Sequence, residues 1–261
     1  MAVVHVLMSS SDQVPIGHRI IRLDSVDSTN NYAAKLLSSG ELSHGSVIMA
    51  DEQTAGRGQR GSSWTSGAGE NLLLTIVLKP ANLSVSEQFR LTQFASLGLI
   101  DLLAKYHLKG SIKWPNDIYV KDKKLSGMLI ENQVSSTSVS TVLLGIGLNV
   151  NQTEFPGLAA TSLQSELGMF IPVMELAMSL FFCLNERWKA LDHRNFSELD
   201  NAYQKQLYLR DMPSLFSDET GLFTGTVIGT TEQGLLIIAR ENDEIRQYDL
   251  KEIQFMPRND P

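Results

Sequence analysis

The chain has 261 residues, of which 43% are hydrophobic and 20% charged, a composition typical of a folded protein with one large domain and one small one. Its formal net charge of −7 excludes a general basic field for nucleic acid or an anionic membrane, so any anion site must be local. The single cysteine, Cys183, excludes an internal disulfide and a cysteine-rich zinc site, and it suits a reducing compartment.

The first eight residues are apolar, but they lack the basic segment that begins a signal peptide. No apolar run approaches the roughly 20 residues of a membrane-spanning helix. We therefore expect a cytoplasmic protein that does not contact a membrane.

The N-terminal half of the chain alternates apolar strands with amphipathic helices. Residues 27–30, Asp-Ser-Thr-Asn, offer N-cap groups to the first helix. Four consecutive polar side chains exceed what one cap needs, which leaves some of them for contact with a ligand. The predicted strands are 18–23, 46–50 and 72–78, and the predicted helices are 30–37 and 84–106.

Residues 56–61 fit the spacing G-x-G-x-x-G, the fingerprint of dinucleotide-binding proteins. That fingerprint needs a helix directly after the glycines, because the pyrophosphate of the ligand lies at the helix N-terminus. Here the glycines precede a Ser- and Gly-rich stretch and then the apolar strand 72–78. We therefore predict a long loop between two strands, which argues against a nicotinamide-dependent oxidoreductase.

Residues 112–120 and 125–131 predict two antiparallel strands joined by a charged turn, with Pro115 marking an irregularity in the first. The next predicted strand, 141–150, alternates glycine with apolar residues. Glycine inside a strand often marks the close approach of a ligand or of another backbone. We expect such an approach here.

The C-terminal part predicts two helices and then a change of character near Pro213. Cys183 lies on an apolar helix and is expected to be buried and inert. Short strands separated by turn residues predict a small β-barrel, which we expect to serve as a docking module. The predicted helices are 173–191 and 196–207, the barrel strands are 223–229, 234–238 and 244–248, and the predicted domains are 1–212 and 213–261.

Positive charge gathers at two places far apart in the sequence, the glycine loop with Arg57 and Arg60, and the hairpin with Lys113 and Lys124. Arginine suits bidentate recognition of phosphate or carboxylate, and lysine supplies a point charge. Together these side chains predict a site for a compact polyanion. Trp64, which follows the loop glycines, suits stacking on a ligand about as well as a place in the core.

Four segments in this order resemble biotin protein ligases: 27–30 (DSTN), 53–58 (QTAGRG), 113–117 with 124–127 (KWPND and KLSG), and 145–150 (GIGLNV). Each motif alone is weak, but the four occur in order over about residues 20–150. The resemblance implies an α+β fold, in which a mixed β-sheet with helices of the class II synthetase type precedes a small SH3-like β-barrel.

The resemblance also implies a two-step reaction. The carboxylate of biotin attacks the α-phosphorus of Mg-ATP to give biotinyl-AMP and pyrophosphate, and a lysine of a biotin carboxyl carrier protein then attacks the acyl carbon and releases AMP. Biotin, ATP and Mg²⁺ are thus the implied ligands, and a carboxylase carrier domain is the implied partner. Nucleic acid is not expected as a partner, and a homodimer is left open.

The family pattern assigns roles to the matching residues. Catalytic roles fall to Arg57, Lys124 and Asp117, of which Asp117 either orients the carrier lysine or holds Mg²⁺. Biotin contacts are implied for Ser28, Thr29, Asn30, Gln53, Gly56, Arg57, Lys124 and Gly127. Contacts to ATP or the adenylate are implied for Arg57, Arg60, Trp64, Lys113, Asn116, Lys124 and Asn149.

The chain departs from the family pattern at Gln59 and Ser62, where many members have arginine. The phosphate contacts must then come from the remaining cations or from backbone N–H groups. The glycine loop is expected to act as a lid that orders over the ligand and keeps water from the mixed anhydride. About 18 residues precede the first catalytic strand, too few for the helix-turn-helix domain of repressor ligases, so we expect no DNA binding.

Two alternatives share parts of this pattern. A lipoate or octanoate protein ligase has the same fold, but its Arg-Arg and Gly-Gly-Gly pattern is absent here, and the KWPND segment favours biotin. A non-catalytic biotin-binding module is the other alternative. Retention of both Arg57 and Lys124 argues against it, because binding biotin alone does not require so much charge.

Overall fold

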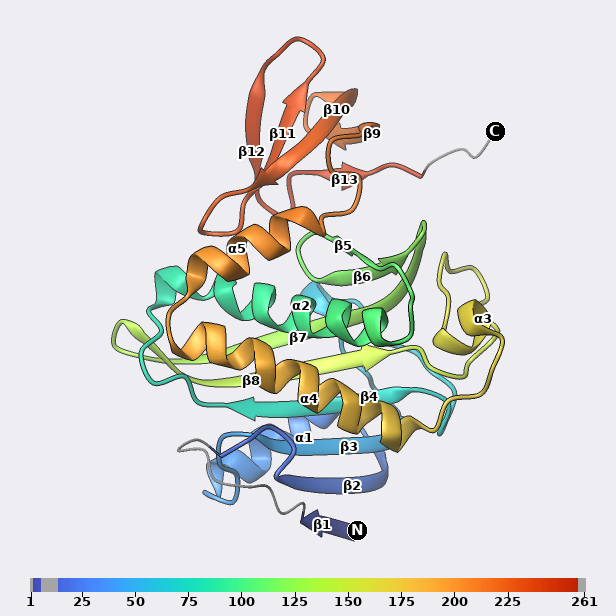
Figure 1. Ribbon diagram of the computed structural model, residues 1–261, viewed down its shortest axis with the longest axis vertical. Coiled ribbons are helices and arrows are strands. Elements are labelled where there is room, and N and C mark those ends of the chain that lie inside the picture. Colours follow the sequence, from blue (N-terminus) through green and yellow to red (C-terminus); the bar gives the residue numbers. More distant parts are fainter. Residues whose placement is uncertain (1, 6–13, 258–261) are drawn as a thin grey trace.

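A computed structural model of the chain describes residues 2–5 and 14–257. Its centre is an eight-stranded mixed sheet in the order β1-β2-β3-β4-β8-β7-β6-β5 (Figure 1). Strands β2 and β3 are parallel, and the other neighbouring strands are antiparallel. The strands are β1 Ala2–His5, β2 Arg19–Val26, β3 Ser46–Gln53, β4 Leu72–Leu78, β5 Ser111–Lys113, β6 Asp117–Val120, β7 Lys123–Ser135 and β8 Ser138–Leu148.

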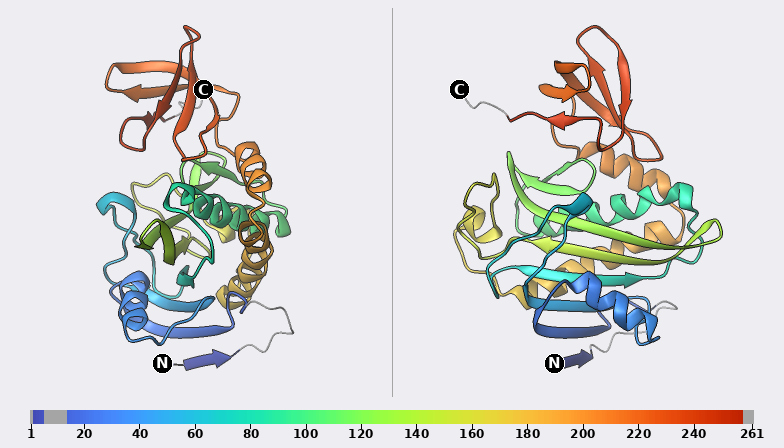
Figure 2. Two further views of the ribbon diagram at one scale, coloured as in Figure 1. Left: turned by 90° about the vertical axis from the view of Figure 1, so that its left-hand side faces the viewer. Right: turned by 180° about the vertical axis from the view of Figure 1, so that it is seen from behind.

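Helices cover both faces of this sheet (Figures 1 and 2). Helices α2 and α4 pack together over one face with α5 against them, and α1 lies on the other face. Every residue of the central strand β4 is buried, as expected from a sequence that is apolar except for Thr75. The helices are α1 Thr29–Ser38, α2 Phe89–Lys105, α3 Leu163–Leu167, α4 Val173–Asp192 and α5 Phe196–Lys205, with 3₁₀ turns at Gln59–Gly61 and Val85–Glu87.

The predicted strands at 46–50, 72–78 and 125–131 are confirmed, but the single strand predicted over 112–120 is wrong. The chain reverses after Lys113, with a cis peptide between Trp114 and Pro115, and β5 pairs antiparallel with β6. Proline lacks the N–H that a strand needs to continue its ladder, so the segment forms a tight hairpin instead. The reversal places residues 114–116 beside the start of β7.

A second sheet of five short antiparallel strands follows the helices, in the order β12-β11-β10-β9-β13. The large mixed sheet followed by this small one confirms the predicted fold class. The domain boundary at residue 213 stays a prediction, although the second sheet begins at that residue. Its strands are β9 Pro213–Asp218, β10 Gly221–Thr230, β11 Leu236–Arg240, β12 Ile245–Tyr248 and β13 Gln254–Phe255.

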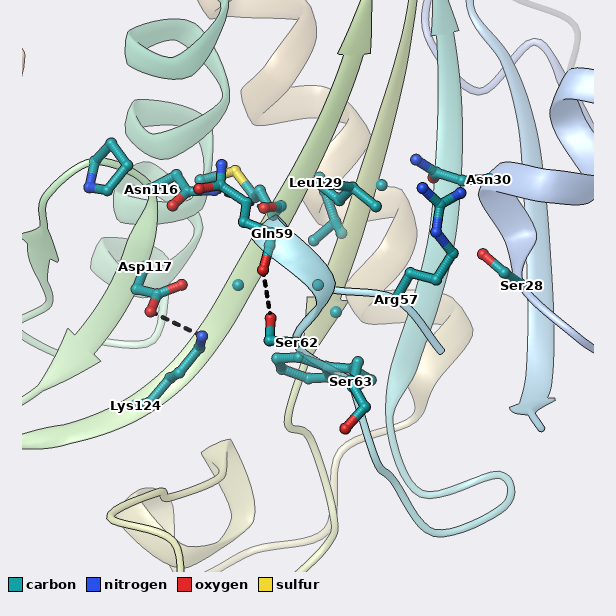
Figure 3. A pocket seen from close by; sticks show the side chains of 18 of the residues that line it. Ser28, Asn30, Arg57, Gln59, Ser62, Ser63, Asn116, Asp117, Lys124 and Leu129 are labelled. Carbon is teal, nitrogen blue, oxygen red and sulfur yellow. Dashed lines mark hydrogen bonds and ion pairs between the residues drawn. The ribbon is translucent and has the colours of Figure 1, made fainter. Parts of the chain in front are cut away.

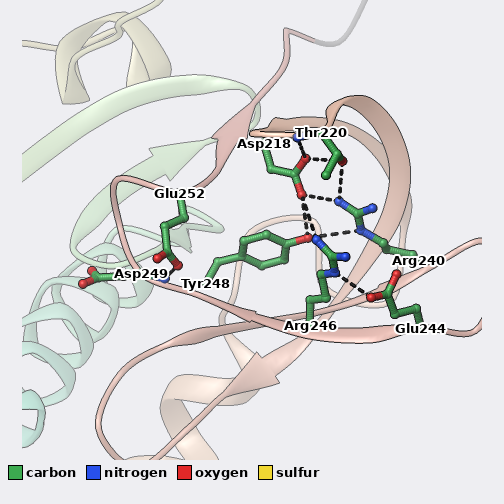
Figure 4. Close-up of polar contacts among 8 residues, drawn as sticks. All are labelled: Asp218, Thr220, Arg240, Glu244, Arg246, Tyr248, Asp249 and Glu252. Atoms are coloured by element: carbon green, nitrogen blue, oxygen red, sulfur yellow. Dashed lines mark hydrogen bonds and ion pairs between the residues drawn. The ribbon is translucent and has the colours of Figure 1, made fainter.

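A buried ion pair lies inside the second sheet (Figure 4). The Asp218 side chain is only 2% exposed, pairs with Arg240 and accepts a hydrogen bond of 3.1 Å from the hydroxyl of Tyr248. The Arg240 guanidinium also lies 3.8 Å from the centre of the Phe223 ring. These contacts compensate the charge that burial removes from water.

The second sheet contacts the large one at the reversal after β5. Trp114 Nε1 donates a hydrogen bond of 2.8 Å to the carbonyl of Gly234, in the turn between β10 and β11. Lys113 Nζ lies 5.4 Å from the ring centre of Phe255 in β13. The small sheet therefore holds residues 113–114 in place, in addition to any docking role.

None of the helices in the described ranges is long and apolar enough to cross a membrane. Cys183 is buried on α4, as predicted, and burial raises the pKa of its thiol.

His44, just before β3, carries an ionisable ring within the packed part of the fold. Its ring centre lies 4.7 Å from that of Trp188, and the backbone N–H of Lys79 donates to its Nδ1 at 3.1 Å. Burial lowers the pKa of His44 to about 4, with smaller contributions from His18 and Lys79 in the same direction and from Asp192 against it. The folded protein therefore holds His44 neutral.

This burial predicts an acid-sensitive stability. The folded-state pKa lies below the ordinary histidine value of about 6.5, so the contribution of neutral His44 is fully present above pH 6.5 and is lost as the pH falls toward 4. Urea titrations should show that the free energy of unfolding falls by about 2 kcal/mol between pH 7.5 and 5. His44→Gln should remove most of this slope, and an unchanged slope in that variant would contradict the assignment.

Candidate active site

A cavity of about 270 Å³ opens on the α1 side of the large sheet, under the glycine loop (Figure 3). The described residues that line it include three cations, Arg57, Lys113 and Lys124, and one carboxylate, Asp117. Its lining is therefore positive in a chain whose net charge is −7. The other lining residues are Ser28, Thr29, Asn30, Gln53, Gly58, Gln59, Ser62, Ser63, Trp64, Leu74, Trp114, Pro115, Asn116, Gly127, Met128, Leu129, Gly145, Ile146, Gly147 and Leu250.

Three glycines lie in the sheet beneath the cavity, so the sheet has no side chains at these positions. Gly127 of β7 pairs directly with Gly147 of β8, and Gly145 lies two residues further along the same face. A Cβ at Gly147 would come within 2.5 Å of the Trp64 indole, and one at Gly145 within 2.5 Å of Asn30 Oδ1. The glycine pattern of this strand predicted the close approach of a ligand or of another backbone, and the groups that the structure places there are instead the side chains of Asn30 and Trp64.

One end of the cavity is polar, and the Arg57 guanidinium on this side (Figure 3) is paired with the Glu131 carboxylate. Thr29 donates to Gln53 Oε1 through its backbone N–H at 2.7 Å and its hydroxyl at 3.0 Å. Ser28 is the N-cap of α1 but makes no side-chain capping bond, and it lines the cavity instead. The structure thus brings three of the residues predicted to contact biotin into one wall.

The other end carries charge. Lys124 Nζ forms an ion pair of 2.8 Å with Asp117 Oδ2 and lies 5.8 Å from the centre of the Trp64 ring. The indole N–H of Trp64 is buried and has no hydrogen-bond partner among the residues that the structure describes. A cation, a carboxylate and an aromatic face therefore meet at this end (Figure 3 shows the two charged groups).

The KWPND segment forms the wall behind these charges. Burial lowers the pKa of Lys113, which donates to the Tyr119 hydroxyl at 3.1 Å. The Asn116 amide donates to the Met128 carbonyl at 2.5 Å and so ties the hairpin reversal to β7. Both residues line the cavity, as their predicted place near the adenylate requires.

The glycine loop is a loop between two strands, as predicted, and it closes over the cavity. The backbone N–H of Trp64 donates to the carbonyl of Gly56 at 2.9 Å, and the backbone N–H of Gly58 donates to the carbonyl of Ser62 at 2.7 Å. Gly56 has no room for a side chain, because a Cβ would come within 2.4 Å of the Trp64 carbonyl oxygen. The loop therefore has a hairpin shape in which its two glycines allow the backbones to meet.

Arg57 contacts protein groups that were not predicted from the sequence. Its guanidinium donates to Glu131 Oε1 and to Asn31 Oδ1, both at 2.8 Å. In Figure 3 it points toward Asn30 and lies on the opposite side of the cavity from Lys124. Protein groups thus hold this side chain at the cavity, and its contact with carboxylate and phosphate stays a prediction.

Two predicted ligand contacts lie outside the cavity lining. Asn149 is buried, does not line the cavity, and donates through its amide to the carbonyl of Thr161 at 3.0 Å. Gly56 also lies behind the lining, under Gln53. The side chain of Arg60 lies outside the described part of the structure, so its role stays a prediction.

Two functional positions had no local signal in the sequence. Leu250, from the segment after β12, lines the cavity although it lies 100 residues beyond the end of the nearest motif, 145–150. Glu131 follows the apolar residues of β7 and bonds to the glycine loop 74 residues earlier in the chain. Only the pairing of distant strands brings them to the site.

The matches to known proteins agree with this architecture. Residues 23–149 match the model of the biotin/lipoate A/B protein ligase family. These residues include most of the large sheet and most of the residues that line the cavity. The structure superposes on the biotin protein ligase from Aquifex aeolicus in complex with biotin and ATP with a TM-score of 0.74 and 29% identity, covering 91% of this chain and 98% of that one.

Sequence relatives narrow the class. The chain is 32% identical over 226 residues to a biotin–[acetyl-CoA-carboxylase] ligase of Paracoccus denitrificans, covering 83% of this chain and 92% of that one. It is 28% identical over 247 residues to a bifunctional ligase/repressor of Bacillus subtilis, covering 92% and 74% of the two chains. The chain belongs to the biotin protein ligase family, which confirms the resemblance read from its four motifs.

The contact between Gly147 and Trp64 can be tested directly. Gly147→Ala forces the indole off β8, since its Cβ would lie 2.5 Å from the ring. We expect acrylamide to quench the tryptophan fluorescence more strongly and the Kd for ATP to rise about three- to tenfold. The same substitution in a Trp64→Phe background should leave quenching nearly unchanged, and equal changes in both backgrounds would contradict the contact.

Proposed function

We propose that this protein joins biotin to ATP as biotinyl-5′-AMP and then transfers the biotinyl group to a lysine of a biotin carboxyl carrier protein. The observation that carries the proposal is the division of one cavity into a polar end at Gln53 and a cationic end at Lys124. Biotin has the matching division, with an uncharged ureido ring at one end and a carboxylate at the other.

The polar end suits the ureido group. Ser28, Thr29 and Gln53 offer hydroxyl and amide groups that both donate and accept hydrogen bonds, as the ureido N–H and carbonyl groups require. Gly145 and Gly147 let Asn30 and Trp64 lie close against the sheet, which leaves the space between these side chains and Gly127 for the ring system. Bound in this direction, biotin directs its carboxylate toward Lys124.

Lys124 then offsets the repulsion between two anions. A carboxylate oxygen of biotin attacks the α-phosphorus, the bond to the pyrophosphate oxygen breaks, and pyrophosphate leaves. A fixed cation aimed at the reacting oxygens stabilises the charge that develops there. Trp64 supplies an aromatic face beside Lys124 on which adenine can stack.

Mg²⁺ enters this proposal with ATP. Among the described residues, no three His, Cys, Asp or Glu side chains are grouped to hold a metal ion. Asp117 is the single carboxylate lining the described cavity, and Mg²⁺ in nucleotide sites is held by one or two carboxylates plus phosphates and water. The residues therefore fit an ion carried mainly by the phosphates, and Asp117 would hold it.

In the second step the amine of the carrier lysine attacks the acyl carbon, and the bond to the AMP oxygen breaks. The glycine loop lies over the cavity and would keep water from the mixed anhydride until the carrier arrives. A carboxylase carrier domain is the proposed partner, and the single thiol fits a cytoplasmic setting.

Lipoate is the competing acid, because the family model covers both biotin and lipoate ligases. Biotin-dependent exchange of labelled pyrophosphate into ATP tests the choice. We expect exchange with biotin, at most a trace with lipoate, and no loss of the biotin signal when lipoate is added. Exchange with neither acid would refute the ligase proposal, and exchange with lipoate alone would replace its substrate.

Lys124→Ala separates binding from chemistry. Since Lys124 lies at the reacting end and not at the ureido end, we expect adenylate formation to fall about a hundredfold or more while the Kd for biotin changes only severalfold. Calorimetry with biotin and single-turnover formation of biotinyl-AMP measure the two effects. Equal losses in both would remove Lys124 from the reacting end.

A further inference from the structure

Glu131 lies on β7, two residues beyond Leu129 and on the same face of the strand as the cavity. Both of its carboxylate oxygens are occupied. Oε1 accepts from Arg57 Nη2 at 2.8 Å, and Oε2 accepts from Asn30 Nδ2 at 2.7 Å. One side chain thus connects the glycine loop to the start of α1.

We propose that Glu131 is a positioning residue that holds the glycine loop closed over the cavity through Arg57. The proposal assigns Arg57 to loop closure and not to the phosphate. It rests on the proposed function only for the identity of the ligand beneath the loop, since the contact itself exists without a ligand.

The contacts of the loop support this role. The hydrogen bonds between Gly56 and Trp64 and between Gly58 and Ser62 lie inside the loop, so they shape it without attaching it to the sheet. The Arg57 guanidinium reaches out of the loop, to Glu131 on β7 and to Asn31 on α1. Asn31 is itself held by its amide, which donates to Asp27 Oδ2 at 2.9 Å.

The same carboxylate reaches the ureido end of the cavity through buried groups. Asn30 Oδ1 lies 2.5 Å from the Thr75 hydroxyl, which lies 2.8 Å from that of Thr29. Thr29 in turn donates to Gln53. A continuous series of hydrogen-bonded groups therefore joins the Arg57 guanidinium to the wall that is proposed to contact the ureido group of biotin.

The expected size of the effect follows from exposure. The side chains of Arg57 and Glu131 are 46% and 35% exposed, and ion pairs in such positions are weak. Loss of the pair should raise the open fraction of the loop about three- to fivefold and should not unfold the protein. A ligand that binds only the closed form then shows an apparent Kd that rises in inverse proportion to the remaining closed fraction.

Proteolysis of the ligand-free protein tests the anchor by itself. Chymotrypsin can cut after Trp64 only when the loop opens, and the cutting rate follows the open fraction. We expect Glu131→Gln and Arg57→Gln each to speed cutting about three- to fivefold, and the double variant to be no faster than either. Additive increases, or no increase with Glu131→Gln, would overturn the proposal.

Kinetics then shows what the anchor does for turnover. In pyrophosphate exchange, Glu131→Gln should raise the KM for biotin, by at most about three- to fivefold, and leave kcat within about twofold. Glu186→Gln, which breaks an equally short but more exposed ion pair with Lys189 on α4, is the matched control and should change neither constant. A fall in kcat alone would show that Glu131 acts on the chemistry and would overturn the positioning role.

The two proposals fail separately. A parent protein without exchange activity refutes the ligase function, whereas the proteolysis cycle still decides whether Glu131 anchors the loop.

Discussion

One strip of the large sheet consists of glycines and has no side chains. This determines how closely the walls of the active site can approach the sheet. Gly127, Gly145 and Gly147 lie on neighbouring positions of β7 and β8, so the indole of Trp64 and the amide of Asn30 rest almost on the backbone. Glycine inside a strand costs stability, and burial on both faces of the sheet offsets that cost. The floor of the cavity is therefore formed by buried strands of the sheet. Its walls are formed by residues 28–30, the glycine loop and residues 113–117.

The walls differ in what holds them. Residues 28–30 are fixed by the first turn of α1 and by the buried Thr75 hydroxyl, and residues 113–117 by a hairpin reversal that Asn116 ties to β7. The glycine loop instead depends on a partly exposed ion pair and on one aromatic contact. The free energy needed for local opening is thus expected to be highest in the sheet and lowest in the glycine loop. This distribution is the one expected where a ligand must enter the site and a larger partner must then reach it.

Local patterns in the sequence predicted much of this site. The strand after the glycine loop excluded a dinucleotide fold, and the alternating glycines of β8 marked the close approach that the structure shows. Ser28, Thr29 and Gln53 could be placed together because short motifs carry them. The partner of Arg57 could not be predicted in the same way. Glu131 is a partly exposed carboxylate after an apolar run, and such a residue looks like ordinary surface until the fold brings it next to Arg57. The reversal of the chain after Lys113 could not be predicted, because a proline at this position is equally compatible with an irregularity within one strand.

The contact between Trp114 and Gly234 also bears on how the protein is made. The segment that carries Lys113 and Asp117 is braced by a turn 120 residues later, and Leu250 closes the same cavity from near the end of the chain. A ribosome must therefore release the chain through residue 250 before the site can exist in complete form. Until then the nascent chain lacks the contact that braces Trp114 and the side chain that completes the wall of the pocket.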